Sequence, residues 1–437
     1  PGTIPHWTAQ STQTDTLFGL AVGTAGDVNG DGYADVIVGA PRYDGGETDE
    51  GAVFVYHGGA AGPDAIASWT AESNQAGAEL GRAVGGAGDV NGDGYSDIGV
   101  GAWRYDSTGI DDGQVFAWYG SQVGLGANGT PDNADWQFGG IYSSSYLGAA
   151  VGTAGDVNGD GFSDVVVSAH GFESDLQDQG RVAVFHGSVA GLSDVAWEVF
   201  GEQAGCFLGS AVGTAGDVNG DGFSDVVIGA PDYSGSHAHE GRIYIYHGSP
   251  DGLEAMPAAK VSSSRTNGYL GGSVGTAGDV NGDGYPDLVL AARDDSSGTE
   301  SSWCYWGDAD GFSDNRRAPL ATSLACDVAV GHLDDSPCAA VVIAAERDEV
   351  TFSVPSLVFR GTPGGIDPAP VRLLTHNARR ALIGHFRGAG RPELVFVNHR
   401  ARRSGGDIDP VIYTGGPEGF AAERRIQDRK STRLNSS

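Results

Sequence analysis

The sequence predicts an all-β fold, a seven-bladed β-propeller made of four-stranded blades and closed by the N-terminal strand. Three observations lead to this prediction. A segment of about 20 residues recurs along the chain, each copy is followed by the same series of short apolar runs, and a strand-like segment precedes the first complete unit. A unit of this size cannot bury its apolar face alone, so the units must pack against one another.

The repeated segment is AVGTAGDVNGDGYADVIVGAP at 21–41, and it recurs four times with few changes. Two further copies keep the apolar pattern and lose the acidic residues, with His332 and His385 in place of the first Asp. The sequence therefore contains seven units, each roughly 60 residues long. In the five acidic copies the first Asp of the loop is Asp27, Asp89, Asp156, Asp217 and Asp279.

Each unit is expected to form four strands. The first ends at the acidic loop, and the second is a continuous apolar run, such as 36–38, which is typical of a strand buried on both faces. The third, such as 53–56, ends in a His-Gly turn. The fourth carries a tryptophan in three of the units, at Trp69, Trp136 and Trp197.

The N-terminal segment indicates how the ring closes. His6-Trp7-Thr8 matches Ser68-Trp69-Thr70, the last strand of a unit, although it precedes the first unit. Unit seven ends after its third strand, so the N-terminal strand is expected to complete blade seven and leave no open edge. The alternative, a linear array of β repeats, leaves this first strand without a partner. The propeller is expected to span 1–424, and 425–437, which differ sharply in composition, to form a non-native or disordered tail.

Composition narrows the classes of partner. The net charge of −32 and the pI near 4.4 oppose binding to nucleic acid or to anionic lipid. No apolar run approaches the roughly 18 residues of a membrane helix, so membrane insertion is not expected. We expect a monomeric domain whose natural partner is a divalent cation.

The acidic loops have the chemistry of a calcium site. In the loop Asp27 to Asp35, side-chain oxygens stand at positions 1, 3, 5 and 9, and the Gly at position 6 permits a sharp turn. Carboxylate and amide oxygens without His or Cys favour Ca²⁺ over transition metals. Position 7 is expected to contribute its backbone carbonyl. The predicted ligands, for about five Ca²⁺ per chain, are Asp27, Asn29, Asp31, Tyr33, Asp35; Asp89, Asn91, Asp93, Tyr95, Asp97; Asp156, Asn158, Asp160, Phe162, Asp164; Asp217, Asn219, Asp221, Phe223, Asp225; and Asp279, Asn281, Asp283, Tyr285, Asp287.

The two degenerate units are expected to bind no metal at this position. Their residues at the four side-chain ligand positions lack the required set of oxygens. These residues are His332, Asp334, Ser336 and Ala340 in unit six, and His385, Arg387, Ala389 and Glu393 in unit seven.

These motifs resemble the FG-GAP repeat family, and the chain is similar to the N-terminal propeller of integrin alpha subunits. Phe18-Gly19 and Gly39-Ala40-Pro41 give both halves of the family name, and Leu-Gly replaces Phe-Gly in later units. The resemblance covers about 5–423 and implies metal loops on one face and ligand contacts on the other. The weak affinity of extracellular calcium modules, on the order of 10⁻⁴ to 10⁻³ M, favours an extracellular or cell-surface location.

The loops after the second strand of each unit are the expected ligand-binding face. They lie at the end of the strands opposite to the acidic loops and carry aromatic and Arg side chains, which often anchor a protein or carbohydrate ligand. The alternative for each residue is that it only packs against neighbouring loops. The predicted ligand-binding residues are Tyr43, Trp103, Arg104, Tyr105 and Tyr233.

A binding scaffold for adhesion or ligand recognition is favoured over an enzyme. The alternative is a secreted enzyme acting on polysaccharide or lipid, or the accessory propeller of one, because the same repeats accompany such enzymes. No GxSxG, HExxH or nucleotide-binding motif is present. His237 and His239 could chelate a transition metal, although a His pair in a polar loop is more often solvated. The scattered cysteines are compatible with one disulfide or with four thiols.

Overall fold

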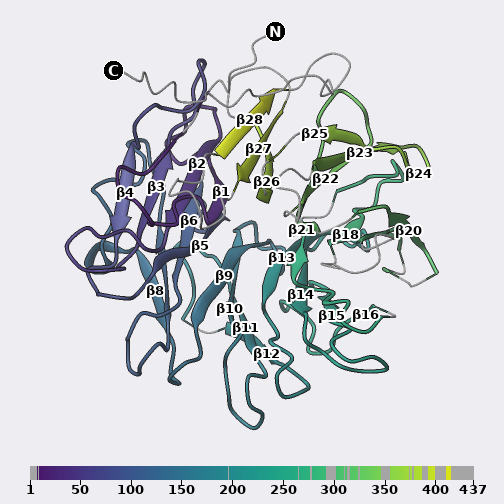
Figure 1. Cartoon of the computed structure of the whole chain (residues 1–437), viewed down its shortest axis with the longest axis horizontal. Coiled ribbons are helices and arrows are strands. Elements are labelled where there is room, and N and C mark those ends of the chain that lie inside the picture. The colour runs from purple at the N-terminus through teal and green to yellow at the C-terminus, as the bar shows by residue number, and fades with distance from the viewer. Residues whose placement is uncertain are drawn as a thin grey trace, which may run out of the picture.

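The strands of this protein form seven antiparallel sheets around a central axis (Figure 1). The computed structural model describes residues 7, 9–194, 196–263, 265–275, 278–291, 302–309, 311–312, 315–322, 325–345, 355–373, 375, 378–385, 392–398 and 410–414. The fold is the predicted all-β propeller of seven blades. The only helical element in these residues is one 3-10 turn, η1 (Pro131–Asn133).

The first four blades are regular and share one strand order. Blade one contains β1 (Ala21–Gly26), β2 (Asp35–Ala40), β3 (Ala52–Tyr56) and β4 (Trp69–Glu72); blade two, β5 (Leu80–Gly88), β6 (Asp97–Ala102), β7 (Gln114–Trp118) and β8 (Trp136–Gly139); blade three, β9 (Leu147–Gly155), β10 (Asp164–Ala169), β11 (Arg181–Phe185) and β12 (Ala196–Phe200); blade four, β13 (Ala211–Gly216), β14 (Asp225–Ala230), β15 (Arg242–Tyr246) and β16 (Ala259–Ser262).

Blade five keeps this strand order with a two-residue first strand, whereas blades six and seven depart from it. In blade six, β23 pairs with both β24 and β25, so two short strands replace the single fourth strand, with Pro368 and Pro370 between them. Proline cannot donate to a ladder, which explains the interruption. Blade five contains β17 (Ser273–Val274), β18 (Leu288–Ala291), β19 (Ser302–Tyr305) and β20 (Arg317–Leu320); blade six, β21 (Ala325–Gly331), β22 (Ala340–Ala345), β23 (Ser356–Thr362), β24 (Gly365–Ile366) and β25 (Val371–Leu373); blade seven, β26 (Ala378–Gly384), β27 (Glu393–Asn398) and β28 (Pro410–Thr414).

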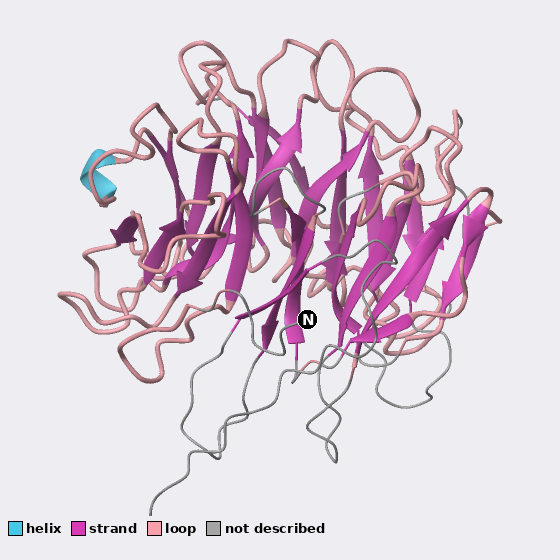
Figure 2. Cartoon of the chain, turned by 90° about the horizontal axis from the view of Figure 1, so that it is seen from above, coloured by secondary structure: helices cyan, strands magenta, loops and turns pink. Residues whose placement is uncertain are grey.

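The first strand of each blade lies nearest the central axis and the last strand lies at the rim (Figure 1). The strands cross the thickness of the disc, so the loops gather at its two faces (Figure 2). Because the acidic loops all connect a first strand to a second strand, they lie at the same end of their blades. The loops that follow the second strands lie at the other end.

The core is divided among the interfaces between neighbouring blades. The second strand of every regular blade is buried along its whole length, as its continuous apolar sequence predicts. One apolar cluster, for example, joins Val53 and Trp69 of blade one to Ile98 and Trp118 of blade two. Each sheet therefore packs on both faces, and each blade depends on its neighbours for burial.

Another of these clusters joins the N-terminal segment and blade one to blade seven. It contains Trp7, Phe18 and Val38 together with Val395 of blade seven. The backbone N–H of Ala34 in blade one also donates to the carbonyl of His385 in blade seven, at 3.2 Å. Blade seven thus lies against blade one. The expected pairing of the N-terminal strand with β28 lies outside the described residues, as does the predicted tail 425–437.

All four cysteines are free thiols, which decides between the two alternatives left open by their spacing. In the described part of the chain, no helix is long and apolar enough to cross a membrane.

Candidate functional site

The acidic loops of neighbouring blades are bonded to one another through their backbones. The N–H at position 8 of one loop donates to the carbonyl at position 1 of the preceding loop, as from Ser96 to Asp27 at 3.0 Å and from Ser163 to Asp89 at 2.9 Å. The bond between Ala34 and His385 is the same bond between blades one and seven. All five acidic loops lie on one face of the disc, and those of blades one to four are linked in this way. Position 8 of the fifth loop is Pro286, which has no N–H to donate, so this bond is missing between blades four and five.

Within each loop the acidic side chains accept hydrogen bonds from the loop's own backbone. In blade one, the Asp27 carboxylate accepts from the N–H groups of Asp31 (3.1 Å) and Gly32 (2.8 Å), and the Asp31 carboxylate accepts from that of Tyr33 (3.0 Å). The Asn29 side-chain oxygen accepts from the N–H of Asp31 at 3.0 Å. The same pattern recurs in the other four loops. These bonds hold positions 1, 3 and 5 at the exposed end of the loop.

The Asp at position 9 lies apart from these three residues. The Asp35 carboxylate is fully buried and accepts the N–H of Val28 at 2.9 Å and the N–H of Gly58 at 2.7 Å. The His-Gly turn thus lies beside the acidic loop. The corresponding residues make the same two bonds in the other blades: Asp97, Asp164, Asp225 and Asp287.

Burial also changes the protonation of these position-9 residues. Desolvation raises the pKa of Asp35 and Asp164 to about 6 and that of Asp97, Asp225 and Asp287 to about 7. Backbone hydrogen bonds act in the opposite direction, and neighbouring carboxylates, such as Asp93 and Asp89 beside Asp97, raise the pKa further. Each loop contains several carboxylates and no Lys or Arg side chain that could offset their negative charge.

The donor set fits a hard divalent cation. Each carboxylate or amide oxygen of Asp27, Asn29 and Asp31 accepts one hydrogen bond in the loop, which leaves a lone pair for a cation. Among the described residues, however, no group of three or more His, Cys, Asp or Glu side chains lies close enough together to hold a metal ion. The structure therefore brings positions 1, 3 and 5 to one loop end and places position 9 behind them.

The aromatic residue at position 7 has a packing role. Its ring lies against the Gly at position 4 of the preceding loop, so a Cβ added to Gly30 would lie 2.6 Å from Tyr95 Cε1. The same arrangement places Phe162 against Gly92 and Phe223 against Gly159. Glycine at position 4 is required for this contact as well as for its positive φ of 72° in Gly30.

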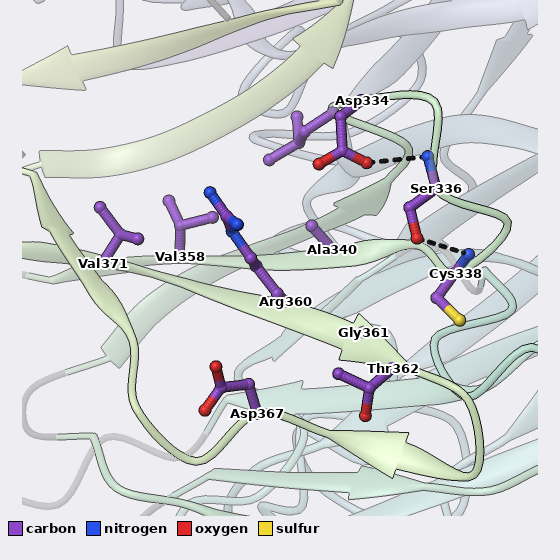
Figure 3. Close-up of a pocket in the computed structure, with 11 residues that line it drawn as sticks. Asp334, Ser336, Cys338, Ala340, Val358, Arg360, Gly361, Thr362, Asp367 and Val371 are labelled. Carbon is purple, nitrogen blue, oxygen red and sulfur yellow. Dashed lines mark hydrogen bonds between the residues drawn. The ribbon is translucent and has the colours of Figure 1, made fainter. Parts of the chain in front are cut away.

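The degenerate loop of blade six has a different geometry (Figure 3). Asp334 accepts the N–H of Ser336 at 2.9 Å, and Ser336 Oγ accepts the N–H of Cys338 at 3.2 Å. Position 9 is Ala340, so the buried carboxylate is missing, and the N–H of Gly361 bonds the Ala339 carbonyl instead. A cavity of about 350 Å³ lies beside this loop. In blade seven, positions 2 to 7 lie outside the described residues.

The residues predicted to bind a ligand are not gathered at one point. Tyr43 and Tyr105 each pack edge-on against the third strand of their own blade, on Phe54 and Phe116 with ring centroids 5.6 Å apart. Tyr233 lies under the guanidinium of Arg242, 3.7 Å from its ring centroid. These three rings are half-buried and support their loops.

Trp103 and Arg104 form a separate group nearer the axis. The Arg104 guanidinium lies 5.2 Å from the Trp103 ring centroid, and Arg82 approaches the same ring at 4.7 Å. Trp103 also lies beside Tyr146 and His170, with centroids 5.2 and 6.0 Å away. No sign in the sequence pointed to Arg82 or His170, because Arg82 meets Trp103 from another strand of blade two and His170 belongs to blade three.

The His pair in the blade-four loop does not form a chelate. His237 Nδ1 lies 3.3 Å from Glu240 Oε2, whereas His239 Nδ1 lies 3.0 Å from Asp232 Oδ1. Each imidazole thus has its own carboxylate partner.

Comparison with known proteins matches the repeats of this chain to a described family. The FG-GAP repeat model matches residues 18–56, 147–185, 208–246 and 271–302. The first three matched segments run from the Phe-Gly or Leu-Gly pair to the end of the third strand and so contain the acidic loop. Blade two has the same structure without a match.

The curated relatives with similar sequences include integrin alpha chains. Integrin alpha-5 of Xenopus laevis is 32% identical over 218 residues, which are 46% of this chain and 20% of that protein. Integrin alpha pat-2 of Caenorhabditis elegans is 33% identical over 222 residues, 47% of this chain and 17% of that protein. The aligned region spans a fifth or less of the length of these relatives.

A solved structure, that of the exotype rhamnogalacturonan lyase YesX, aligns with 94% of this chain and 75% of its own, at 12% sequence identity and a TM-score of 0.48. This likeness is too weak to carry an argument about activity. The segments that match the FG-GAP model lie within blades of the structure. The chain therefore carries FG-GAP repeats, and in the region that they occupy it is similar to integrin alpha chains.

Proposed function

We propose that this protein is an extracellular, calcium-binding propeller that serves as a scaffold for adhesion or ligand binding. The observation that carries the proposal is the set of five acidic loops on one face of the disc, which share the sequence Asp-Val-Asn-Gly-Asp-Gly and the same hydrogen bonds within the loop. A generic turn has no need of three carboxylates, and their mutual repulsion favours a bound cation. The similarity to integrin alpha chains supports the same interpretation.

In this proposal the Asp and Asn side chains at positions 1, 3 and 5 contact the cation, together with the carbonyl at position 7. The Asp at position 9 completes the donor set, and the hydrogen bonds that its carboxylate accepts from the backbone hold the loop against the His-Gly turn. A bound Ca²⁺ would supply positive charge that stabilises the loop, and the hydrogen bonds within the loop fix its conformation. The opposite face is left to bind a protein or carbohydrate ligand as part of a binding module that is not itself an enzyme.

Metal content tests the calcium loops directly. After dialysis against calcium, we expect about five ions per chain by mass spectrometry of the metal. Asp31→Ala should remove about one ion, whereas Ser336→Ala, at the corresponding position of the degenerate blade-six loop, should remove none. Two ions or fewer in the wild type, or equal loss in both variants, would contradict the proposal.

Ligand binding on the opposite face needs its own test. A glycan and surface-protein array, probed in the presence of calcium, should identify a ligand whose binding is weakened by Trp103→Ala, Arg104→Ala or Tyr233→Ala with calcium content unchanged. Loss of binding only on substitution of the acidic-loop face would overturn this assignment.

A further inference from the structure

Arginine side chains gather around the axis on the face opposite to the acidic loops. Arg82 lies at the start of β5, seven residues before Asp89, and Arg104 follows the end of β6. The other members come from the loop after β2 and from the start of β26, a first strand that lies at the axis like β5 (Figure 1). This arginine cluster consists of Arg42, Arg82, Arg104, Arg379 and Arg380.

An indole ring and one carboxylate organise the centre of the cluster. The Arg82 and Arg104 guanidinium carbons lie 4.7 and 5.2 Å from the Trp103 ring centroid. Trp103 Nε1 donates to Glu79 Oε2 at 2.9 Å, which fixes the ring. Glu79 Oε1 is 3.9 Å from both Arg42 and Arg104, too far for a hydrogen bond.

Among the described residues, the carboxylates beside Arg42, Arg82, Arg104 and Arg380 are fewer than these arginines. Asp327 is bonded to Arg380 at 3.0 Å, and Glu79 is the carboxylate that the described part of the chain places beside the other three. Arg82 makes no side-chain hydrogen bond or ion pair with any described residue. Burial, followed by the charge of Arg380, lowers the pKa of the Arg82 guanidinium, as expected where positive charge is in excess. In a chain of net charge −32, such an excess is an exception.

His170 adds no charge that could offset the excess around Arg82. His170, on the other side of Trp103, has its pKa lowered to about 4 by burial and by Arg82, so it is neutral near pH 7. Arg104 is 43% exposed, so its guanidinium can reach a group that arrives from solvent. A guanidinium donates in a planar fork that matches the oxygens of a carboxylate, sulfate or phosphate.

We propose that the arginine cluster is an anion-binding site at the axis, in which Arg82 and Arg104 donate to an oxyanion of the ligand. This inference rests on the proposed ligand-binding role of this face and gives its chemistry. The oxyanion supplies the negative charge that Glu79 alone does not provide. Trp103 holds the two guanidinium groups in place by cation–π contact and does not itself bind the ligand.

Calorimetry with simple anions tests the site. The protein is kept in saturating calcium at low ionic strength, where charge interactions are least screened. The three probes are glutarate, methyl sulfate and methyl phosphate, monoesters being used because inorganic phosphate would precipitate with calcium, and the one with the lowest Kd identifies the headgroup. We expect at least one to bind, and Arg82→Gln and Arg104→Gln each to weaken it by about tenfold or more.

Arg242→Gln is the matched control, because Arg242 also lies over an aromatic ring at this end of its blade but has Glu202 as its ion partner. It should leave anion binding unchanged. The inference is overturned if no probe binds, or if all three variants weaken binding equally. Arg104 is exposed, so its substitution should not disturb folding. The Arg104 variant therefore tests the site even if the Arg82 variant folds poorly. If the protein binds about five calcium ions but no anion, only the anion-binding inference is refuted. If it binds an anion but no calcium, only the proposal of calcium loops is refuted.

Discussion

Trp7 Nε1 donates a hydrogen bond to the backbone carbonyl of Asp64, at 2.7 Å. Trp69 bonds Ala127 and Trp136 bonds Ser193 in the same way, each from the fourth strand of one blade to the following blade. The Trp7 ring also packs edge-on against Tyr56, as Trp69 does against Trp118. Trp7 therefore occupies the position of a fourth-strand tryptophan in the blade before blade one.

Deletion of residues 1–10 should therefore destabilise the ring. It removes Trp7 and exposes Tyr56 and Val395 at the contact between blades one and seven. We expect a lower Tm in differential scanning fluorimetry and aggregation in size-exclusion chromatography. Deletion of 425–437 is the control and should change neither. A shortened protein that stays monomeric and equally stable would contradict this role of the N-terminal segment.

Two acidic residues of the same loop should behave differently when calcium is removed. Asp97→Ala leaves the buried N–H groups of Val90 and Gly120 without an acceptor, so we expect a loss of about 2–4 kcal/mol in the free energy of unfolding in chelator. Asp93 is exposed, and Asp93→Ala should cost less than about 1 kcal/mol there. Urea denaturation measures both, and equal losses would contradict the anchoring role of position 9.

The contact between neighbouring loops can be tested at Gly30. A Cβ at this residue would lie 2.6 Å from the Tyr95 ring, in addition to the cost of a positive φ. Gly30→Ala should destabilise the metal-free protein by about 2–4 kcal/mol, against about 1–2 kcal/mol for Gly32→Ala, which has a positive φ and no neighbour within 4 Å. In a Tyr95→Ala background the difference between the two variants should disappear.

His170 should reduce stability in acid. Its pKa falls from 6.5 to about 4 through burial and the nearby Arg82, so below pH 6.5 the unfolded chain binds a proton that the folded chain does not. Stability is lost as the pH falls from about 6.5 to about 4 and changes no further below that range. His170→Phe should gain on the order of 3 kcal/mol over the wild type at pH 4 relative to pH 7. The exposed His237→Phe is the control; parallel curves for both variants would refute the assignment.

The propeller could be predicted because the same pattern of short apolar strands recurs in each unit of the sequence. The apolar second strands, the His-Gly turn and the number of blades all follow from residues close together in the sequence. The separate place of Asp35 was not predictable, because its partner Gly58 belongs to a turn two strands away. The arginine cluster was hidden for the same reason, since Arg82 and Arg380 become neighbours only through the ring.

The bond from Ala34 to His385 has a consequence for how the chain folds. It joins residues about 350 positions apart, so the entropy of closing that loop is lost before the contact contributes any stability. Blade one leaves the ribosome first, yet its outer flank stays uncovered until blade seven has been made. During synthesis the Tyr56 side of blade one is therefore the surface most exposed to misassembly, and a chaperone that recognises apolar segments would act there first.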